Sequence, residues 1–577
     1  MHNKILSQPV NFQGSVDFEK QLAHLSFGCC AAKSCFDIKF IAIIQNMVEL
    51  SPMFSKISKI KRIETDCDGK TWINIPRNTV AIEFKLCLKC CNECDKCKNK
   101  SKDKKNNKNC NKKSCKCIKL SLCFPEEMEN ELQQKNLSSR LAMRNCNTCI
   151  IDCTAFDHGH IKEQAGPCRS ARALAIAHIA MFECYIAVHG GYQTYLNPPV
   201  PPQPKASSEA AMAQAMYETL IVLYPDQITR LTNQLNFELN KIPDSKSKTL
   251  GIALGKTCAK AILDMRANDG ANSPPVYPET TYDQYITENP ITGPGQWTQD
   301  PISKNPIALG YHWDQVKPFI IPSASIFRAS PSPALNSVEY MMAFDEVKAL
   351  GGDGITTPTV RTADQTEIGI FFGYDGANNI GVPPRLYNQI TTQIAVSEGL
   401  TNTQLIYLLA LVNVGMADAG LTAWETKYYY KIWRPITAIR EADSDGNPGT
   451  IADPNWTPLG APASNSNNVN FTPNFPSYTS GHATFMYTVA KIIQSILGKN
   501  QISINLTSDE YNGITKDNQG NVRPYRTRYY NSISQIAEDN GQSRIYLGIH
   551  YAFDKTAGQE SGTKVANYVF DNLYQPI

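Results

Sequence analysis

The 577-residue sequence predicts a mainly α-helical protein, with two packed helical bundles preceded by a cysteine- and lysine-rich α+β extension. Three observations lead to this fold class. The chain is longer than one ordinary domain of roughly 100–200 residues. After about residue 165, small and apolar residues recur every three or four positions, as in amphipathic helices. All 19 cysteines lie at or before Cys258. We therefore expect an extension over 1–150, a first bundle with irregular connections over 151–340, and a second bundle over 341–577.

The composition excludes several classes of protein. With 42% hydrophobic and 19% charged residues, the chain can bury a core. We find no uninterrupted apolar run of about 18 residues, so no transmembrane helix is expected. The most apolar segment, 405–421, contains Asn413 and Asp418 and is typical of a buried helix. The first residues lack the apolar stretch of a secretory signal, and a net charge of +3 does not imply a nucleic-acid partner. We expect a soluble protein, whose compartment and oligomeric state the sequence leaves open.

The extension contains a distinct module at about 87–123, with nine cysteines and a local excess of lysine. Residues 81–120 hold 13 lysines against four acidic residues, a balance of 13 − 4 = +9. Three interpretations remain open: a disulfide-stapled loop, which needs an oxidising compartment, a solvated insertion without a specific role, and a zinc site. The CxxC spacing that suits tetrahedral zinc is formed by Cys87, Cys90, Cys94 and Cys97. The β-prone flanks 72–84 and 117–124 predict a hairpin that carries this loop.

The helical part is divided by proline. Segments 170–188 and 207–224 have helical spacing and belong to the first bundle, whereas 197–204 and 273–335 are rich in proline and predict irregular connections. The helices expected in the second bundle are 384–399, 402–433, 480–498 and 529–570.

After residue 312 the chain contains two histidines, and both lie among other reactive residue types. His482 ends the run Thr479-Ser480-Gly481-His482, just ahead of a predicted helix. His550 follows Arg544 by six residues and is itself followed, one helical turn later, by Asp554. At that distance Asp554 is placed to accept a hydrogen bond from Nδ1 of His550.

Three cations accompany these histidines. Lys427 and Arg434 are seven residues apart, which predicts that they share one helix face, while Pro435 discourages helical geometry at Arg434 and should help end the helix. Lys427, Arg434 and Arg544, with the N–H of Gly481 at a helix start, form a set of donors that suits binding of a tetrahedral oxyanion. One histidine would bond its central atom and the other would move protons. Taken singly, each segment also fits a solvated helix surface.

These residues resemble the three-part signature shared by vanadium-dependent haloperoxidases and the type 2 phosphatidic acid phosphatase superfamily. The three parts are Lys427-x6-Arg434-Pro435, Ser480-Gly481-His482 and Ser543-Arg544-x5-His550-x3-Asp554. Segments 170–185, 373–390, 417–440, 474–485 and 543–554 are similar to the fungal vanadium chloroperoxidase branch. The resemblance covers about 165–577 and leaves 1–150 without a counterpart. One position departs from the family pattern, because Thr479 stands where proline is usual.

The resemblance implies a role for each matched residue. His550 would be the axial ligand of vanadium, His482 the acid–base residue, and Asp375 the partner of Arg544. Lys427 would also polarise bound peroxide. The vanadate oxygens would be held by Lys427, Arg434, Ser480, Gly481 and Arg544, and the halide would lie near Trp424 and Phe475.

The implied function is a vanadate-dependent haloperoxidase, which oxidises a halide with hydrogen peroxide to hypohalous acid and halogenates a small organic acceptor. One alternative is a soluble acid phosphatase that uses the same site with His550 as nucleophile. The other is a non-catalytic, particle-associated or interaction protein in which the N-terminal module is the working part.

Overall fold

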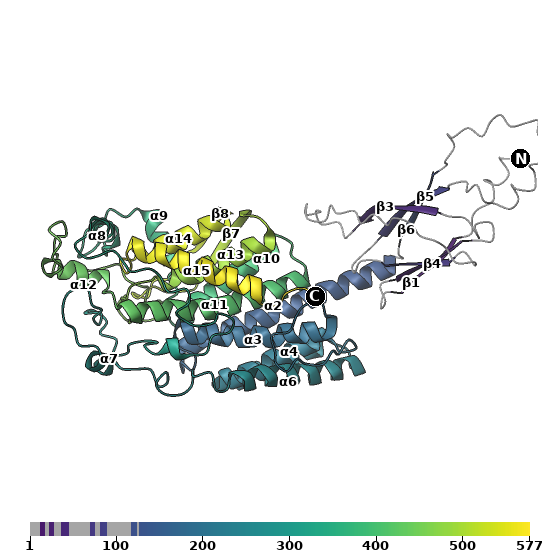
Figure 1. Ribbon diagram of the computed structural model, residues 1–577, viewed down its shortest axis with the longest axis horizontal. Helices are drawn as coiled ribbons and strands as arrows, with labels where there is room; N and C mark the ends of the chain where they lie inside the picture. Colours follow the sequence, from purple (N-terminus) through teal and green to yellow (C-terminus); the bar gives the residue numbers. More distant parts are fainter. Residues whose placement is uncertain are drawn as a thin grey trace, which may run out of the picture. The chain divides into compact units, whose positions relative to one another are not determined.

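The computed structural model of the chain describes the backbone of six strands between residues 12 and 123, the helix from residue 126 onward, and side chains from Met143 to Ile577. The chain forms two compact units, Met1–Ser138 and Ser139–Ile577. Element labels are those of Figure 1. The predicted fold class, mainly α with an N-terminal extension that contains strands, is confirmed.

The first unit contains two antiparallel three-stranded sheets, ordered β1-β2-β4 and β3-β5-β6. The predicted hairpin around the cysteine-rich loop is confirmed, because β5 pairs with β6 and places Cys87 opposite Cys117. Cys90, Cys94 and Cys97 lie outside the described residues, so zinc binding there stays a prediction. The strands are β1 (Phe12–Asp17), β2 (Leu22–Phe27), β3 (Phe36–Ile44), β4 (Lys70–Asn74), β5 (Ala81–Leu88) and β6 (Cys117–Cys123).

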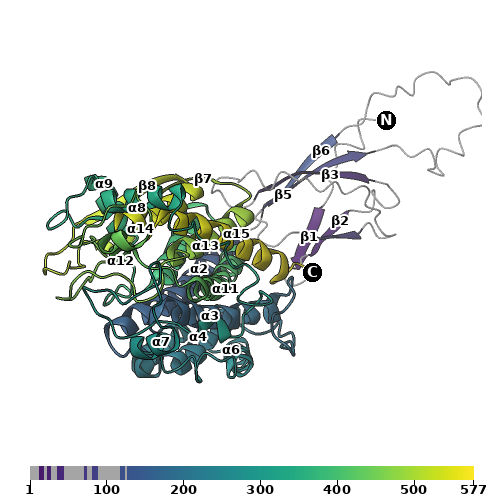
Figure 2. The ribbon, with the colours of Figure 1, turned by 60° about the vertical axis from the view of Figure 1, so that its left-hand side comes forward.

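The second unit is built from helices packed in layers. α11 packs against α3 on one side and against α13 and α15 on the other, while α4 and α6 pack on α3. Both views show α11 between these two groups (Figures 1 and 2). The elements are α2 (Glu126–Gly159), α3 (Gly166–His189), α4 (Ser208–Leu223), η2 (Pro225–Gln227), α5 (Ile228–Asn240), α6 (Lys246–Arg266), α7 (Tyr282–Glu288), η3 (Trp313–Gln315), α8 (Val338–Gly351), α9 (Ala363–Phe371), α10 (Pro383–Ser397), α11 (Asn402–Tyr430), α12 (Pro435–Arg440), η4 (Ala442–Ser444), α13 (Gly481–Leu497), β7 (Gln501–Asn512), β8 (Tyr525–Ser532), α14 (Ile533–Tyr546) and α15 (Ala552–Asn572).

The two most apolar helices form the centre of this unit. α3 and α11 are long and apolar enough to cross a membrane by length and composition, but 83% and 94% of their most apolar windows are buried inside the fold. A helix that is apolar on all sides is expected where neighbours surround it. Asn413 and Asp418 are buried in α11 with partners: Asn413 Nδ2 donates to the Leu409 carbonyl at 2.7 Å, and Asp418 accepts from three backbone amides of 319–321.

The structure corrects two details of the sequence-based expectation. Lys427 and Arg434 do not share a helix face, because α11 ends at Tyr430 with Lys431 in the left-handed conformation (φ 55°). Arg434 is extended (φ −82°, ψ 156°) and precedes α12, as Pro435 favours. In addition, the segment expected to be helical over 529–570 begins with strand β8, which pairs with β7. The alternating burial along β7 explains why this hairpin is stable.

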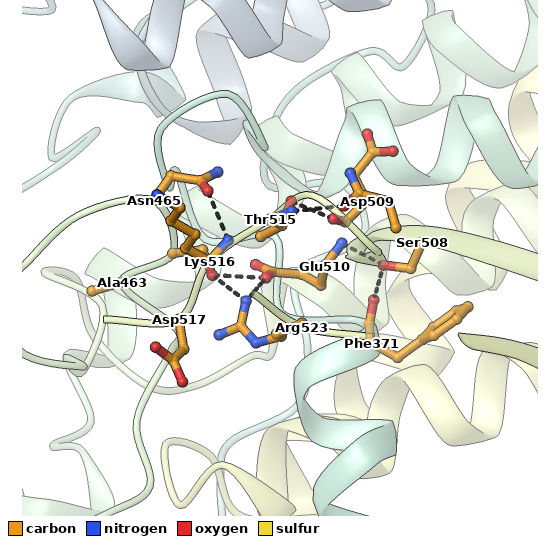
Figure 3. Close-up of polar contacts among 12 residues, drawn as sticks. Phe371, Ala463, Asn465, Ser508, Asp509, Glu510, Thr515, Lys516, Asp517 and Arg523 are labelled. Atoms are coloured by element: carbon orange, nitrogen blue, oxygen red, sulfur yellow. Dashed lines mark hydrogen bonds and ion pairs between the residues drawn. The ribbon is translucent and has the colours of Figure 1, made fainter. Parts of the chain in front are cut away.

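A polar network joins this hairpin to the loops near the site (Figure 3). Oε2 of Glu510 accepts from Ser464 Oγ at 2.7 Å and from the Arg523 guanidinium. Ser508 Oγ donates to the Phe371 carbonyl at 2.7 Å, at the end of α9. Burial raises the pKa of Glu510 to about 7. The network therefore fixes the end of α9, which leads directly into the loop that carries Asp375.

Candidate active site

A cavity of about 270 Å³ brings the predicted site residues together from distant segments. Its wall includes seven of them, Asp375, Trp424, Phe475, Gly481, His482, Arg544 and His550. The other four are buried side chains, or backbone, immediately behind that wall: Lys427, Arg434, Ser480 and Asp554. Helices α11, α13, α14 and α15 supply six of these residues, and the loops at 375, 434, 475, 480 and 550 supply the other five.

The start of α13 forms one side of the cavity. Ser480 is the N-cap, and its Oγ accepts from the Ala483 N–H at 3.3 Å. The Ser480 N–H donates to the Asp554 carbonyl at 3.0 Å, which ties this turn to α15. A Cβ at Gly558 would lie 2.9 Å from the Ser480 carbonyl, so glycine is needed for α15 to approach so closely. Gly481 then begins a 17-residue helix whose N-terminal dipole favours an anion at the cavity.

Two buried arginines have N–H groups that no described residue accepts. Arg544 donates through Nη2 to both oxygens of Asp375, at 2.7 and 2.9 Å, but its Nε and Nη1 have no partner among the described residues. Arg434 donates from Nε to the Phe475 carbonyl and from Nη1 to the Ile549 carbonyl, and its Nη2 is likewise without a described partner. Burial lowers the pKa of Arg434 to about 9. Buried N–H groups of this kind are costly unless a ligand accepts them.

Lys427 is hydrogen-bonded to the backbone of the turn before Ser480. Its ammonium is fully buried and donates to the carbonyls of Pro476 and Ser477 at 2.9 Å each, and to that of Thr479. A lysine ammonium has three N–H donors, so in this arrangement all three hold the turn before Ser480. Burial, together with the nearby charge of Arg434, keeps the pKa of Lys427 well below its usual value.

His550 is oriented by Asp554. Nδ1 of His550 lies 2.7 Å from Oδ2 of Asp554, and Nε2 lies 3.0 Å from Nη1 of Arg434. Because Nδ1 donates to the carboxylate, Nε2 carries the lone pair and accepts from the arginine. Burial and the charge of Arg434 keep the pKa of His550 well below its usual value, while burial raises the pKa of Asp554 to about 6.

His482 lines the cavity and has one ring nitrogen without a described partner. Its Nε2 is buried and has no hydrogen-bond partner in the described part of the chain, while the ring also interacts with the carbonyl of Phe372. Burial and the charge of Arg544 keep the pKa of His482 well below its usual value. The imidazole is therefore neutral near pH 7 and can take up a proton from a molecule in the cavity. Asn540 and Tyr387 hold the backbone of His482 by donating to its carbonyl at 3.1 and 3.3 Å.

Aromatic rings form the apolar side of the cavity. The rings of Trp424 and Phe475 are 4.8 Å apart, and the Lys427 ammonium lies 5.0 Å from the centre of the Phe475 ring. Trp424 Nε1 donates to the Leu309 carbonyl at 3.0 Å. This hydrogen bond fixes the indole in the wall of the cavity, where it forms a weakly polar surface next to the buried Lys427 ammonium.

Gly310 allows Trp424 to occupy this position. A Cβ at Gly310 would lie 2.5 Å from Cδ1 of Trp424, and the backbone there has φ +71°. We expect Gly310→Ala to lower the free energy of unfolding by about 2–4 kcal/mol through overpacking and backbone strain, measured by denaturant titration. Gly190→Ala is the matched control, with φ +67° and open space around the added methyl. Equal losses in the two variants would show that Trp424 does not pack against Gly310.

Several residues of the site were not anticipated from the sequence. Ser477 donates through Oγ to Asp554 Oδ2 at 2.5 Å, and His158 and Glu279, from the N-terminal half of the helical unit, line the cavity. Ser477 lies within the segment 474–485, but nothing in its spacing indicates contact with a residue 77 positions later. Among the described residues there is no group of three or more His, Cys, Asp or Glu side chains that could hold a metal ion.

The donor set fits a tetrahedral oxyanion. Arg544 and a helix N-terminus line the cavity, and Arg434 and Lys427 are buried behind its wall. The partnerless N–H groups of Arg434 and Arg544 match the charge and geometry of anionic oxygen. The two neutral histidines supply lone pairs: Nε2 of His482 has no described partner, and Nε2 of His550 accepts from Arg434. The protein is a helical-bundle protein with a buried site whose donors are chemically suited to an oxyanion.

Comparisons with known proteins agree with this class. A family model described as the VCPO second helical-bundle domain matches residues 407–577. The chain is 28% identical over 471 residues to a vanadium chloroperoxidase of Curvularia inaequalis, covering 68% of this chain and 76% of that protein. In sequence the chain therefore resembles the vanadium-dependent haloperoxidase family.

Solved structures show the same fold. A crystal structure described as the first bacterial vanadium-dependent iodoperoxidase superposes with a TM-score of 0.60 at 21% identity, covering 75% of this chain and 97% of that one. A holo-type bacterial vanadium-dependent chloroperoxidase superposes with a TM-score of 0.51 at 15% identity, covering 72% and 96%.

Proposed function

We propose that this chain is a vanadate-dependent haloperoxidase that oxidises a halide with hydrogen peroxide to hypohalous acid, which then halogenates a small organic acceptor. The observation that carries the proposal is the set of buried, partnerless N–H groups on Arg434 and Arg544 beside two neutral histidines. Such groups are stabilised by an oxyanion and by few other ligands.

The residues present fit vanadate. Arg434, Arg544 and the N-terminus of α13 at Gly481 would hold its oxygens, and Nε2 of His550 would bond vanadium in exchange for the hydrogen bond from Arg434. Asp554 supports this bond because it accepts from Nδ1 and thereby makes Nε2 the basic nitrogen. When bound, vanadate supplies a Lewis-acid centre that activates hydrogen peroxide without changing its own oxidation state.

His482 has the position and protonation state of a general base. The residue lines the cavity, and its Nε2 can accept a proton from hydrogen peroxide. An oxyanion bound next to Arg544 would offset the positive charge that lowers the pKa of His482, so the imidazole becomes a better base when the site is loaded. Asn540 and Tyr387 keep the helix turn that carries His482 in place.

Halide and acceptor would enter on the aromatic side. Trp424 and Phe475 face the cavity next to buried cations, an environment that suits a large, weakly hydrated anion. The cavity of about 270 Å³ has room for a halide and hydrogen peroxide.

The proposal is tested with the purified full-length chain and a dye that changes colour on halogenation. We expect dye halogenation to require vanadate, hydrogen peroxide and a halide together, with bromide, chloride and iodide tested in parallel. Hydrolysis of a phosphate monoester that vanadate inhibits, without any dye halogenation, would instead support the acid phosphatase. If the chain shows neither dye halogenation nor phosphatase activity, even at saturating vanadate, the result would support a non-catalytic protein.

A further inference from the structure

Ser477 is hydrogen-bonded both to Asp554, the partner of His550, and to Lys427. Its side chain is completely buried. Its Oγ donates to Oδ2 of Asp554 at 2.5 Å, and its carbonyl accepts from the Lys427 ammonium at 2.9 Å. Its own N–H donates to the Ile432 carbonyl at 2.9 Å, so the backbone around this hydroxyl is also fixed.

The hydroxyl acts on one oxygen of the carboxylate. Oδ2 of Asp554 accepts from three donors, Ser477 Oγ at 2.5 Å, His550 Nδ1 at 2.7 Å and the Tyr551 N–H at 3.2 Å. Oδ1 has no partner among the described residues. Because the Ser477 hydroxyl lies 3.4 Å from His550 Nδ1, it is close to the histidine without replacing the carboxylate as its partner.

This arrangement restricts how Asp554 can rotate. A carboxylate bonded only by His550 could offer either oxygen and let the imidazole turn with it. The Ser477 hydroxyl and the Tyr551 amide, which come from two different loops, hold Oδ2 in one place. The Nδ1–H of His550 must point to that place, and its Nε2 then points toward Arg434 and the cavity.

We propose that Ser477 is a positioning residue for His550: its hydroxyl holds Asp554 so that His550 Nε2 is directed at the central atom of the bound oxyanion. This inference rests on the proposed function, in which that atom is vanadium. Ser477 itself touches neither peroxide nor halide.

The role predicts a specific difference between two anions. Sulfate is tetrahedral and can accept from the same N–H groups, but it does not form a bond to a histidine nitrogen. Vanadate would accept hydrogen bonds from these N–H groups and would also form a bond to the nitrogen of His550. A change that only disturbs the direction of His550 should therefore weaken vanadate and leave sulfate almost unchanged, whereas general damage to the fold should weaken both.

The experiment measures the affinity of the full-length chain for vanadate by equilibrium dialysis and for sulfate by calorimetry, together with the melting temperature. For Ser477→Ala we expect vanadate affinity to fall about tenfold, at the lower end of the range for outer partners of a ligand histidine, with sulfate affinity changed less than about twofold. Ser477→Thr, which keeps the hydroxyl, should restore most of the vanadate affinity. Thr219→Val is the matched control, since Thr219 is equally buried and its hydroxyl donates to the Ala215 carbonyl at 2.9 Å within α4, no residue of which lines the cavity.

The outcomes separate this inference from the proposed function. If the wild-type chain prefers vanadate to sulfate and His550→Ala removes that preference, but Ser477→Ala keeps it, Ser477 does not position the histidine and the proposed function stands. If the wild-type chain shows no preference for vanadate, the proposed function itself fails. If Ser477→Ala does not fold, Ser477→Cys replaces it, because cysteine is of similar size and its thiol is a weaker donor. This variant is expected to lose vanadate affinity by a smaller factor than the alanine variant. Unchanged vanadate affinity in Ser477→Cys would overturn the inference.

Discussion

Replacing His550 with alanine is expected to reduce vanadate affinity to that of sulfate and to abolish halogenation, whereas replacing His482 should abolish halogenation and weaken vanadate binding only moderately. The two histidines differ in their partners. His550 is oriented by Asp554 so that its Nε2 can bond to the oxyanion, while His482 lines the cavity and its Nε2 has no described partner. Dialysis against vanadate and the dye assay, run on both variants, measure the two effects separately.

The control for these variants is a buried histidine away from the site. His178 is fully buried in α3, and its Nδ1 donates to the Leu174 carbonyl at 2.7 Å. A neutral replacement there, His178→Gln, should leave the affinity of the folded chain for vanadate unchanged. Equal loss of vanadate affinity in the His550 and His482 variants would contradict the assigned roles, because His482 would then also be a ligand.

Replacing Lys427 with methionine is expected to lower the free energy of unfolding by about 3 kcal/mol and to eliminate anion binding. Three buried carbonyls, those of Pro476, Ser477 and Thr479, would lose their donor, and each such group costs about 1–3 kcal/mol. Removing a desolvated cation offsets part of this loss. Without the ammonium, the turn that presents Ser480 is no longer held. Denaturant titration and vanadate dialysis measure the two consequences.

A different result would show that Lys427 acts as the resemblance implies. If Lys427 normally reaches the oxyanion, Lys427→Met should weaken vanadate and slow halogenation with little change in stability. Lys564→Met, on an exposed position of α15, controls for the effect of the substitution itself. A large loss in the free energy of unfolding would show that Lys427 holds the turn. A loss of vanadate affinity with little loss of stability would show that it binds the ligand.

The helices of the second unit could be predicted from the sequence because their apolar spacing reflects burial directly. Segment 402–433 corresponds to α11, and segment 480–498 to α13, which begins after the N-cap Ser480. The ends were less predictable. α11 stops at Tyr430, four residues before Arg434, since Lys431 takes a left-handed conformation that the sequence pattern does not reveal. Residues 529–532 form a strand because β7 is available as a partner.

Eight of the candidate site residues could be named from three short motifs, because an oxyanion site needs cations, a helix start and histidines. Asp375, Trp424 and Phe475 followed only from the family resemblance. His550 and Asp554 are four residues apart, so their contact follows from local geometry. Ser477 and Asp554 are 77 residues apart, and their hydrogen bond exists because α15 packs on α13. Contacts between residues so far apart cannot be predicted from the spacing of residues in the sequence.

By itself, the sequence determined the helical fold class and a set of candidate residues for the site, since residue type and local periodicity are properties of the chain. The tertiary structure decided which donors are used and which are left for a ligand. Lys427 is occupied by three carbonyls, whereas Arg434 and Arg544 retain buried N–H groups without described partners. That difference depends on which distant backbone segments reach each cation, and only packing brings those segments there.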